Sequence, residues 1–544
     1  NTVETYIPWA LHEPQEGQFK AEGMLDFEAY FKLVKEMGLY LIVRPTPYIC
    51  AEFDFGGLPA WLLRYPSMRL RVNHPLFLEK VSHFYDWLFP KLLPYQSDQG
   101  GPILMMQVEN EYGSYAEDKA YMRSIAQMMK VRGVTVPLFT SDGTWIEALE
   151  SGTLIEDDIF VTGNFGSQPK ENTDNLRAFM ERYGKKWPLM CTEFWDGWFS
   201  RWSEEIVRRE AEDLAQDVKE MLQLGSMNLF LLRGGTNFGF ISGCSARKTK
   251  DLPQITSYDF DAPITEWGQP TEKYYAVQRV THEVFPELEQ MEPISRQAKA
   301  YGSFPLLGTA NLLDVAADIT EEILLDYPQP MEQIGQNHGY ILYRSDIKNQ
   351  YHEERLKALE THDRCHFYVN LEHLATQYRE EIGDEMLFSA DTERIQIDVL
   401  VENMGRVNYG YKLGAPSQSK GVKGGIMINH QFRKGWKHYA LKFDQEMLAK
   451  LDCYSDPPEK VKAPTFYRFE AELDDIADTF IDCSKYGKGC ISVNGFNLGR
   501  YWNEGPIHYL YVPSGLLKNE FIVFETENVK IEELTLLDHP VYKK

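Results

Sequence analysis

Continuous apolar runs that follow a glycine recur through the first half of the chain. Each comes shortly after a stretch of helical period, and the runs cover residues 39–45, 134–140, 187–193 and 226–233. Glycine tolerates the left-handed conformation that ends a helix, so each glycine is expected to separate a helix from the next strand. The runs do not alternate apolar and polar residues, which is typical of parallel strands buried on both faces.

Three more strands are predicted at residues 2–9, 103–109 and 158–163, which brings the predicted parallel strands to seven. Strands alternating with helices over residues 1–290 predict an α/β fold, specifically a (β/α)8 TIM barrel. A barrel needs eight strands, and the chain opens directly on one. We therefore expect the first barrel strand to lie upstream of Asn1, about one βα unit of 40–50 residues. A doubly wound sheet is the alternative.

The pattern changes after about residue 290. Residues 291–330 contain four prolines in mixed sequence, and we expect a linker that carries a strand or two. Beyond it, short β-type runs recur at all-β spacing. They predict one all-β domain over residues 331–460 and a second over residues 461–544, each a sandwich or jelly roll.

The composition is that of a globular protein, with 43% hydrophobic and 25% charged residues in 544. Its net charge of −25 argues against nucleic acid or an anionic membrane surface as the main partner. No run approaches the ~18–20 apolar residues that span a bilayer. The sequence leaves a monomer and a homodimer open.

Seven cysteines without CxxC spacing indicate neither a disulfide framework nor a zinc site. They favour a reducing compartment, and we expect a cytoplasmic protein. Cell-surface or secreted locations stay open, because the chain begins without Met and in the middle of a motif. The 13 histidines show no HExxH spacing, and no P-loop or GxGxxG sequence occurs. We therefore expect no metal and no cofactor.

Two glutamates stand at the ends of predicted barrel strands. Glu111 follows the run 103–109, and Glu193 ends another apolar run just before Trp195 and Trp198. In a TIM barrel the carboxyl ends of the strands face the active site. Two facing carboxyl groups among aromatic rings are what glycoside cleavage needs, one as the acid and the other as nucleophile or stabiliser. The alternative is an ordinary salt-bridged glutamate at a strand end.

Segments spread over nearly the whole chain carry a resemblance to a known family. They are NTVETYIPWALHEPQEGQF at the start, RPTPYICAEFDFGGLPAWLL (44–63), GGPILMMQVENEYGSY (100–115), PLMCTEFWDGWF (188–199), GGTNFGF (234–240), TSYDFDAP (256–263), ENMGRVNYG (402–410) and KGCISVNGFNLGRYWNEGP (488–506). In this order they resemble the β-galactosidases of glycoside hydrolase family thirty-five. The chain is most similar to the shorter bacterial members that resemble β-1,3-galactosidases.

The resemblance implies a retaining exo-β-galactosidase. Such an enzyme removes terminal β-D-galactose from galactoside oligosaccharides or glycan termini by double displacement, here with a preference for a 1,3 linkage to an N-acetylhexosamine. Asn110-Glu111 matches the family's Asn-Glu pair, which implies that Glu111 is the acid/base and that Asn110 holds the 2-hydroxyl. Glu193 matches the nucleophile.

The resemblance also implies a set of sugar-binding positions. Glu52 is expected at the outer hydroxyls, Trp195 and Trp198 along the leaving group, and Tyr409 at the pocket mouth from the first all-β domain. The full expected set is Tyr6, Cys50, Ala51, Glu52, Asn110, Trp195, Trp198, Phe230, Phe260 and Tyr409. Phe230 and Phe260 stand where tyrosine is common in the family, so each lacks a hydroxyl.

Two other functions remain open at this stage. An exo-β-glucosaminidase would be favoured by an acidic side chain placed against a 2-amino group. A galactose-binding pseudoenzyme is the alternative from a different class. The last module resembles galactose-binding jelly rolls, and we expect a scaffold there rather than a second sugar site.

Overall fold

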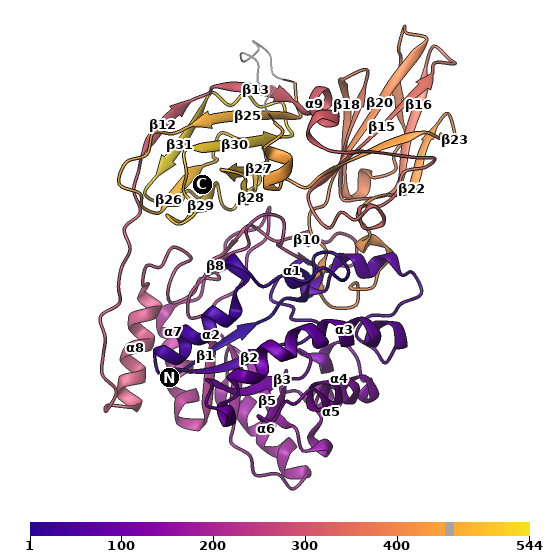
Figure 1. The fold of residues 1–544 in the computed structure, drawn as a ribbon. Coiled ribbons are helices and arrows are strands. Elements are labelled where there is room, and N and C mark those ends of the chain that lie inside the picture. The colour runs from indigo at the N-terminus through magenta and orange to yellow at the C-terminus, as the bar shows by residue number, and fades with distance from the viewer. Residues whose placement is uncertain (452–461, 544) are drawn as a thin grey trace.

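The computed structural model describes residues 1–451 and 462–543, and its N-terminal half is a parallel sheet wrapped by helices (Figure 1). Seven parallel strands pair in chain order: β1 (Thr2–Tyr6), β2 (Tyr40–Arg44), β3 (Ile103–Gln107), β4 (Leu138–Asp142), β5 (Phe160–Phe165), β6 (Met190–Trp195) and β7 (Ser226–Phe230). Each overlaps a predicted strand, although β4 shares only residues 138–140 with the predicted run 134–140, and the TIM-barrel type of fold is confirmed. The order β1 to β7 brings the carboxyl ends of all seven strands to one edge.

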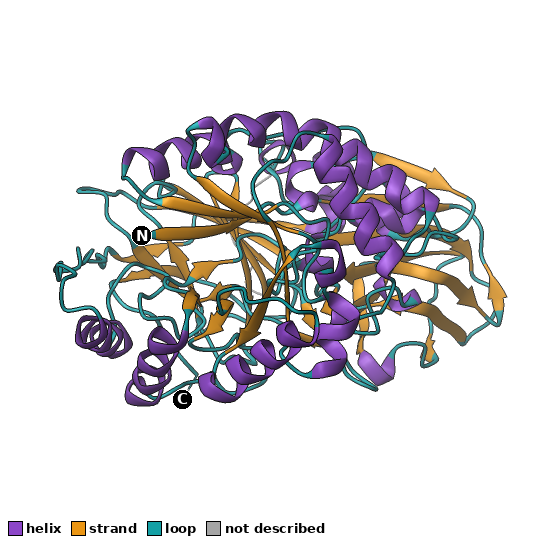
Figure 2. Ribbon diagram, turned by 90° about the horizontal axis from the view of Figure 1, so that it is seen from below, coloured by secondary structure: helices purple, strands orange, loops and turns teal. Residues whose placement is uncertain are grey.

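Helices surround the strands on the outside (Figure 2). They are α1 (Trp9–His12), α2 (Phe27–Glu36), α3 (Pro75–Leu92), α4 (Lys119–Val131), α5 (Ile146–Gly152), α6 (Pro169–Arg182), α7 (Ala211–Leu224) and α8 (Glu272–Val284). Aspartates cap two of them: the side chain of Asp26 accepts from Ala29 N, and that of Asp118 from Tyr121 N.

The glycines that precede the strands end helices in two different ways. Gly38, Gly133 and Gly184 have φ of 71°, 102° and 70°, the left-handed conformation expected from the sequence. Gly225 differs, because its φ is −178° and its backbone is extended. A Cβ at Gly225 would lie 2.4 Å from the carbonyl oxygen of Leu189, so close packing of β7 on β6 requires glycine there.

The middle module is a two-sheet β structure, as expected. Its larger sheet holds, in spatial order, β14 (Glu322–Leu325), β24 (Trp436–Leu441), β15 (Tyr340–Lys348), β20 (Arg394–Glu402), β17 (Arg364–Val369) and β18 (Glu372–Tyr378). Its smaller sheet holds β19 (Met386–Phe388), β16 (Glu354–His362), β22 (Gly421–Ile428) and β23 (Gln431–Phe432). The short helix α10 (Gln445–Leu448) follows.

The C-terminal module is also built from two sheets. One holds β13 (Gly308–Asn311), β25 (Thr465–Glu470), β30 (Glu520–Glu525), β27 (Lys488–Val493) and β28 (Phe496–Trp502). The other holds β12 (Gly302–Pro305), β31 (Glu533–Leu537), β26 (Thr479–Asp482) and β29 (Tyr509–Val512). Both β modules lie on the same side of the barrel (Figure 1).

The segment 291–330, expected to be a linker with a strand or two, contributes strands to both β modules. After an extended stretch beyond α8, it supplies β12 and β13 to the sheets of the C-terminal module. It then forms α9 (Leu312–Ile319) and supplies β14 to the middle module. The chain therefore enters the C-terminal module before it builds the middle one.

Four short strands follow β7. They are β8 (Gly235–Thr236), β9 (Cys244–Ser245), β10 (Leu252–Pro253) and β11 (Ser257–Tyr258). Two of them, β9 and β10, form a sheet with a strand of the middle module, while β8 and β11 pair with each other. β9 pairs with β21 (Val407–Tyr409), which belongs to the middle module. This pairing carries residues 407–411 to the mouth of the barrel. Among the described residues no helix has the length and apolar content needed to cross a bilayer.

Candidate active site

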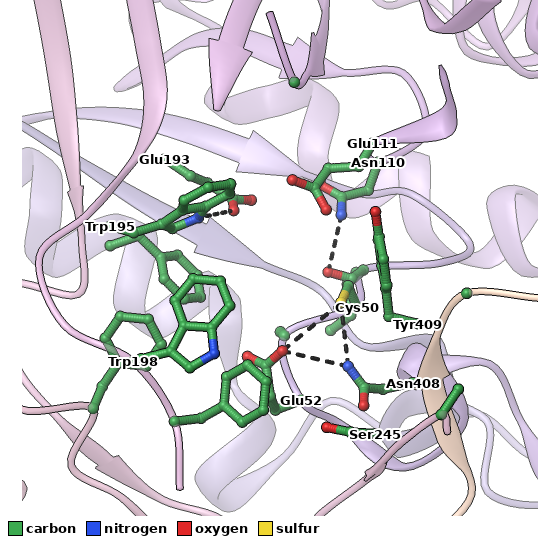
Figure 3. Close-up of a pocket in the computed structure, with 18 of the residues that line it drawn as sticks. Cys50, Glu52, Asn110, Glu111, Glu193, Trp195, Trp198, Ser245, Asn408 and Tyr409 are labelled. Atoms are coloured by element: carbon green, nitrogen blue, oxygen red, sulfur yellow. Dashed lines mark hydrogen bonds between the residues drawn. The ribbon is translucent and has the colours of Figure 1, made fainter. Parts of the chain in front are cut away.

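A cavity of about 470 Å³ opens at the carboxyl ends of the barrel strands (Figure 3). The residues expected there from the sequence all line it: Tyr6, Cys50, Ala51, Glu52, Asn110, Glu111, Glu193, Trp195, Trp198, Phe230, Phe260 and Tyr409. The structure thus brings together side chains from the barrel strands, from the loop after β2 and from the middle module.

The cavity has a closed end and an open mouth. Glu193, Phe230 and Phe260 are 7%, 6% and 4% exposed, so the floor and inner wall are buried. Trp145 and Tyr411, which also line the cavity, are 51% and 73% exposed and mark its mouth. A pocket closed at one end accepts the terminal unit of a chain rather than an internal one.

Three donors hold the carboxylate of Glu193 at the end of β6. Tyr6 OH donates to Oε1 at 2.7 Å, and Arg44 Nη1 donates to the same oxygen at 2.5 Å. Trp195 Nε1 donates to Oε2 at 3.2 Å, as drawn in Figure 3. The orientation of this carboxylate is therefore fixed before any ligand enters.

Arg44 is fully buried and connects several groups beneath the pocket. Besides Glu193, it pairs with Glu4, whose Oε1 lies 2.5 Å from Arg44 Nε. Its Nη1 also donates to Asn110 Oδ1 at 3.1 Å. Burial raises the pKa of Glu4 to about 7, with the charge of Arg44 opposing this rise. One guanidinium thus orients Asn110 and Glu193 together.

Glu111 faces Glu193 across the pocket (Figure 3). Asn164 Nδ2, at the end of β5, donates to Glu111 Oε1 at 3.1 Å. Burial, followed by the negative charge of Glu193, raises the pKa of Glu111 to about 8. A carboxyl group that keeps its proton at neutral pH, opposite a second carboxyl group, suits acid-assisted displacement.

Glu109 does not share the pocket face with Glu111, although strand alternation predicts that it should. β3 ends at Gln107, and Glu109 and Glu111 both have left-handed φ of 57° and 47°, so the alternation stops. Glu109 is instead buried against Arg71, which donates to it from Nε at 2.9 Å and Nη2 at 2.8 Å. Glu109 accepts from Asn110 N, and Arg71 donates to Asn110 O, so this ion pair fixes the backbone before Glu111.

The loop after β2 holds three successive left-handed residues. Cys50, Ala51 and Glu52 have φ of 59°, 46° and 51°, a conformation that non-glycine residues rarely adopt. Such strain persists where surrounding contacts enforce it, often at functional sites. Glu52 accepts from Tyr258 OH and from Asn408 Nδ2, and burial raises the pKa of Glu52 to about 7.

Asn408 is a pocket residue that the sequence analysis missed. Its Nδ2 donates to Cys50 Sγ at 3.3 Å, and its backbone oxygen accepts from Tyr48 OH at 2.6 Å. Next to it, Tyr409 OH donates to Ser114 Oγ at 2.7 Å. The middle module therefore completes the pocket wall, and the motif ENMGRVNYG is the sequence signal that could have identified Asn408.

Aromatic rings form the rest of the wall. Phe230 and Phe260 meet edge to face at 5.3 Å between ring centroids, and Tyr6 meets Phe230 at 6.1 Å. Trp195 and Trp198 meet edge to face at 5.5 Å. Such rings offer the apolar faces on which the C–H surface of a sugar stacks.

Other residues of the site were not expected as site residues. They are Glu4, Arg44, Arg71 and Asn164 beneath the pocket, and Trp145, Arg201, Ser245, Arg247 and Tyr411 along its lining. Within the described residues no cluster of three or more His, Cys, Asp or Glu side chains could hold a metal ion. The six cysteines in those residues are free thiols; Cys453 lies outside them.

Comparison with known proteins gives matches along most of the chain. The model described as "Glycosyl hydrolases family 35" matches residues 1–284. "Beta-galactosidase, first all-beta domain" matches residues 328–442, and "Beta-galactosidase, galactose-binding domain" matches residues 464–521.

Curated relatives match over nearly the full length. The chain is 34% identical to "Beta-galactosidase 17" of Arabidopsis thaliana, covering 99% of this chain and 83% of that protein. It is 35% identical to "Beta-galactosidase-1-like protein 2" of Homo sapiens, covering 96% and 82%. It is 31% identical to "Beta-galactosidase 1" of Dictyostelium discoideum, covering 100% and 87%.

Proposed function

Because the chain belongs to glycosyl hydrolases family 35 and is a glycoside hydrolase, we propose that it is a retaining exo-β-galactosidase acting by double displacement. Its substrates are galactoside oligosaccharides or glycan termini with a terminal non-reducing β-D-galactose. The observation that carries the proposal is the pair Glu111 and Glu193, which face each other across a pocket (Figure 3) whose inner wall is buried.

In the first step Glu111 gives its proton to the glycosidic oxygen, and Glu193 attacks the anomeric carbon. The bond to the leaving sugar breaks, and that sugar departs as an alcohol. We assign the attack to Glu193 Oε2, because it accepts one hydrogen bond from Trp195 while Oε1 accepts from both Tyr6 and Arg44. The product of this step is a galactosyl ester of Glu193.

In the second step the roles of Glu111 reverse. As a carboxylate it takes a proton from water, and the water oxygen attacks the anomeric carbon and displaces Glu193. Two inversions leave galactose in the β configuration. A pKa of about 8, raised by burial and by Glu193, supports Glu111 as the proton donor at neutral pH.

Galactose recognition is proposed to rest on polar groups in an otherwise apolar pocket. Asn110 Oδ1 accepts from Arg44 and from Gln107, and its Nδ2 donates one N–H to Ile49 O at 3.4 Å. The second N–H of the same amino group is proposed to donate to the 2-hydroxyl. Glu52 is proposed to bind the outer hydroxyls. A sugar without a hydroxyl at the right place leaves such a buried group unpaired, and this makes the discrimination steep.

The preference for galactose β-1,3-linked to an N-acetylhexosamine rests on the sequence resemblance. Hydrolysis of β-1,3-, β-1,4- and β-1,6-linked galactosyl-N-acetylglucosamine, compared by kcat/KM, tests it. A larger value for the 1,4 or 1,6 isomer contradicts the preference and leaves the galactosidase assignment intact.

Trapping the intermediate tests the function itself. A 2-deoxy-2-fluorogalactosyl fluoride slows the second step, and we expect mass spectrometry to find the label on the peptide containing Glu193. Nitrophenyl β-galactoside and β-glucosaminide are assayed in parallel with Glu193→Gln and with the exposed control Glu171→Gln. Turnover of the glucosaminide alone would indicate a glucosaminidase, and full activity of Glu193→Gln would refute the nucleophile assignment.

A further inference from the structure

Two arginines line the pocket, although the chain carries a net charge of −25. Arg201 lies in the loop that follows β6, and Arg247 lies in the loop between β9 and β10. The inner part of the same pocket holds the carboxyl groups of Glu52, Glu111 and Glu193. The pocket therefore has acidic groups where the terminal galactose binds, a largely buried arginine, Arg201, in its wall, and an exposed one, Arg247, at its solvent side.

Arg201 is held in place by its own loop and by Ser245 of β9. Its Nε donates to Ser245 Oγ at 2.8 Å, its Nη1 donates to Glu204 at 3.0 Å, and its guanidinium lies 4.7 Å from the ring centre of Phe199. Its side chain is only 13% exposed. These contacts fix the guanidinium at the pocket wall, so a ligand that binds it does not have to order a free side chain.

Arg247 is exposed, and its charge has no partner carboxylate within the described part of the chain. Its side chain donates only to the carbonyl oxygen of Ala246, at 2.8 Å. The nearest acidic residue along the chain, Asp251, is engaged by the backbone N of Arg247 and by Lys412 Nζ. Lys248, the next residue, is also exposed and adds to the positive charge of this loop.

The mouth of an exo-acting pocket is where the leaving sugar must lie, because the inner end is closed around the terminal unit. A guanidinium group binds carboxylate and sulfate through parallel N–H donors, which gives both charge and geometric selectivity. On the premise of the proposed function, we infer that the leaving sugar carries an anionic group, a sulfate ester or a carboxylate, that pairs with Arg247 and Arg201.

The experiment compares matched substrates that differ only in the anionic group. The sulfate pair is galactosyl-β-1,3-N-acetylglucosamine with and without a 6-sulfate. The carboxylate pair is galactosyl-β-1,3-glucuronic acid and galactosyl-β-1,3-glucose. We expect a kcat/KM ratio of anionic to neutral substrate of about twofold to tenfold in at least one pair, the range given by one or two exposed ion pairs. This ratio should fall as salt is added.

Arg247→Gln should lower the ratio towards one, with Arg201 still in place, and Arg394→Gln is the matched control. Arg394 is exposed, like Arg247, and its side chain donates only to a backbone oxygen, that of Asp346. The inference is overturned if the wild-type ratio is one or below in both substrate pairs, or if Arg247→Gln leaves the ratio unchanged. In either case, hydrolysis of nitrophenyl galactoside would still support the proposed function. If the wild-type protein hydrolyses no galactoside, both the proposed function and the inference about the leaving sugar are overturned.

Discussion

Arg44 Nη1 lies 2.5 Å from Oε1 of Glu193, and this contact joins the proposed nucleophile to a buried ion pair beneath it. The partner in that pair is Glu4, on the neighbouring strand, whose side chain is 4% exposed. The guanidinium thus stands between two carboxyl groups. The position of Glu193 depends on a residue that no ligand can reach.

We predict that Arg44→Gln lowers kcat/KM for nitrophenyl galactoside by at least about 100-fold and the free energy of unfolding by about 3–5 kcal/mol. The reason is that both Glu4 and Glu193 lose their buried partner at once. Steady-state kinetics and urea unfolding measure the two effects. Glu4→Gln is the control: it keeps the size of the side chain, and its loss of activity should be clearly smaller.

The roles of the two glutamates predict opposite products with azide. When Glu193→Gly is supplied with azide, the small anion replaces the nucleophile and forms α-galactosyl azide. When Glu111→Gly acts on an activated aryl galactoside, azide attacks the galactosyl ester of Glu193 and forms the β product. The mutations should each lower kcat on unactivated galactosides by about 100-fold or more. NMR of the anomeric proton distinguishes the products, and the same anomer from both variants would contradict the assignment.

The raised pKa of Glu111, about 8, predicts how activity and stability depend on pH. Activity needs the proton on Glu111, so kcat/KM should fall as pH rises through about 8. In the unfolded chain a glutamate has an ordinary pKa of 4.5. Between pH 4.5 and 8, Glu111 therefore keeps its proton in the folded state and has lost it in the unfolded state. Raising the pH through this window therefore lowers stability.

Two variants separate these effects. Glu111→Gln should weaken the fall of stability between pH 4.5 and 8, measured by unfolding at several pH values. Glu266→Gln serves as the comparison, because burial also raises the pKa of Glu266 to about 8 while its carboxylate accepts from Tyr509 OH outside the pocket. If Glu266→Gln removes the alkaline limb of the activity profile, Glu111 is not its source.

Most barrel strands could be predicted because they are apolar runs that end near a polar residue; β1, with the sequence TVETY, is the exception. β16, in the middle module, could not be recognised in the same way. Its sequence ERLKALETH is rich in helix formers, yet Leu356 and Ala358 alternate inward in the strand. Packing of these side chains between the two sheets outweighs the helical preference of the segment.

The site was predictable to the extent that its residues follow strand ends or resemble family motifs. Arg44 and Glu4 required the register of β1 on β2, in which Tyr6 stands beside Arg44, and periodicity does not determine register between parallel strands. Asn408 required the pairing of β21 with β9, which joins segments more than 150 residues apart. Long-range pairing of this kind leaves no local pattern in the sequence.

Removing a single donor to Glu193 should reduce activity by a smaller and measurable amount. Tyr6→Phe deletes the 2.7 Å hydrogen bond to Oε1, and Trp195→Phe deletes the 3.2 Å hydrogen bond to Oε2. A hydrogen bond to a charged group contributes about 1.5–3 kcal/mol, so each variant should lose about 10- to 100-fold in kcat. Phe199→Tyr, on the lining beyond Trp198, is a control that changes an aromatic side chain without removing a donor.

A final prediction concerns the junction of the barrel and the middle module. Arg406 is fully buried and pairs with Asp54 of the barrel at 2.8 Å and with Glu332 of the middle module at 2.5 Å. Because Asn408 and Tyr409 follow directly, this pair positions the pocket wall that the middle module supplies.

Arg406→Met should therefore lower the free energy of unfolding by about 3–5 kcal/mol, since it leaves buried carboxylates unpaired. It should also raise KM for nitrophenyl galactoside, because Asn408 and Tyr409 no longer reach the pocket in a fixed position. The matched control is Arg344→Met, which breaks the pair between Arg344 and buried Asp398 within the middle module alone. If both variants lose stability but only Arg406→Met has a raised KM, the junction acts on the pocket. An equal rise in KM for the two variants would attribute the effect to general destabilisation of the module.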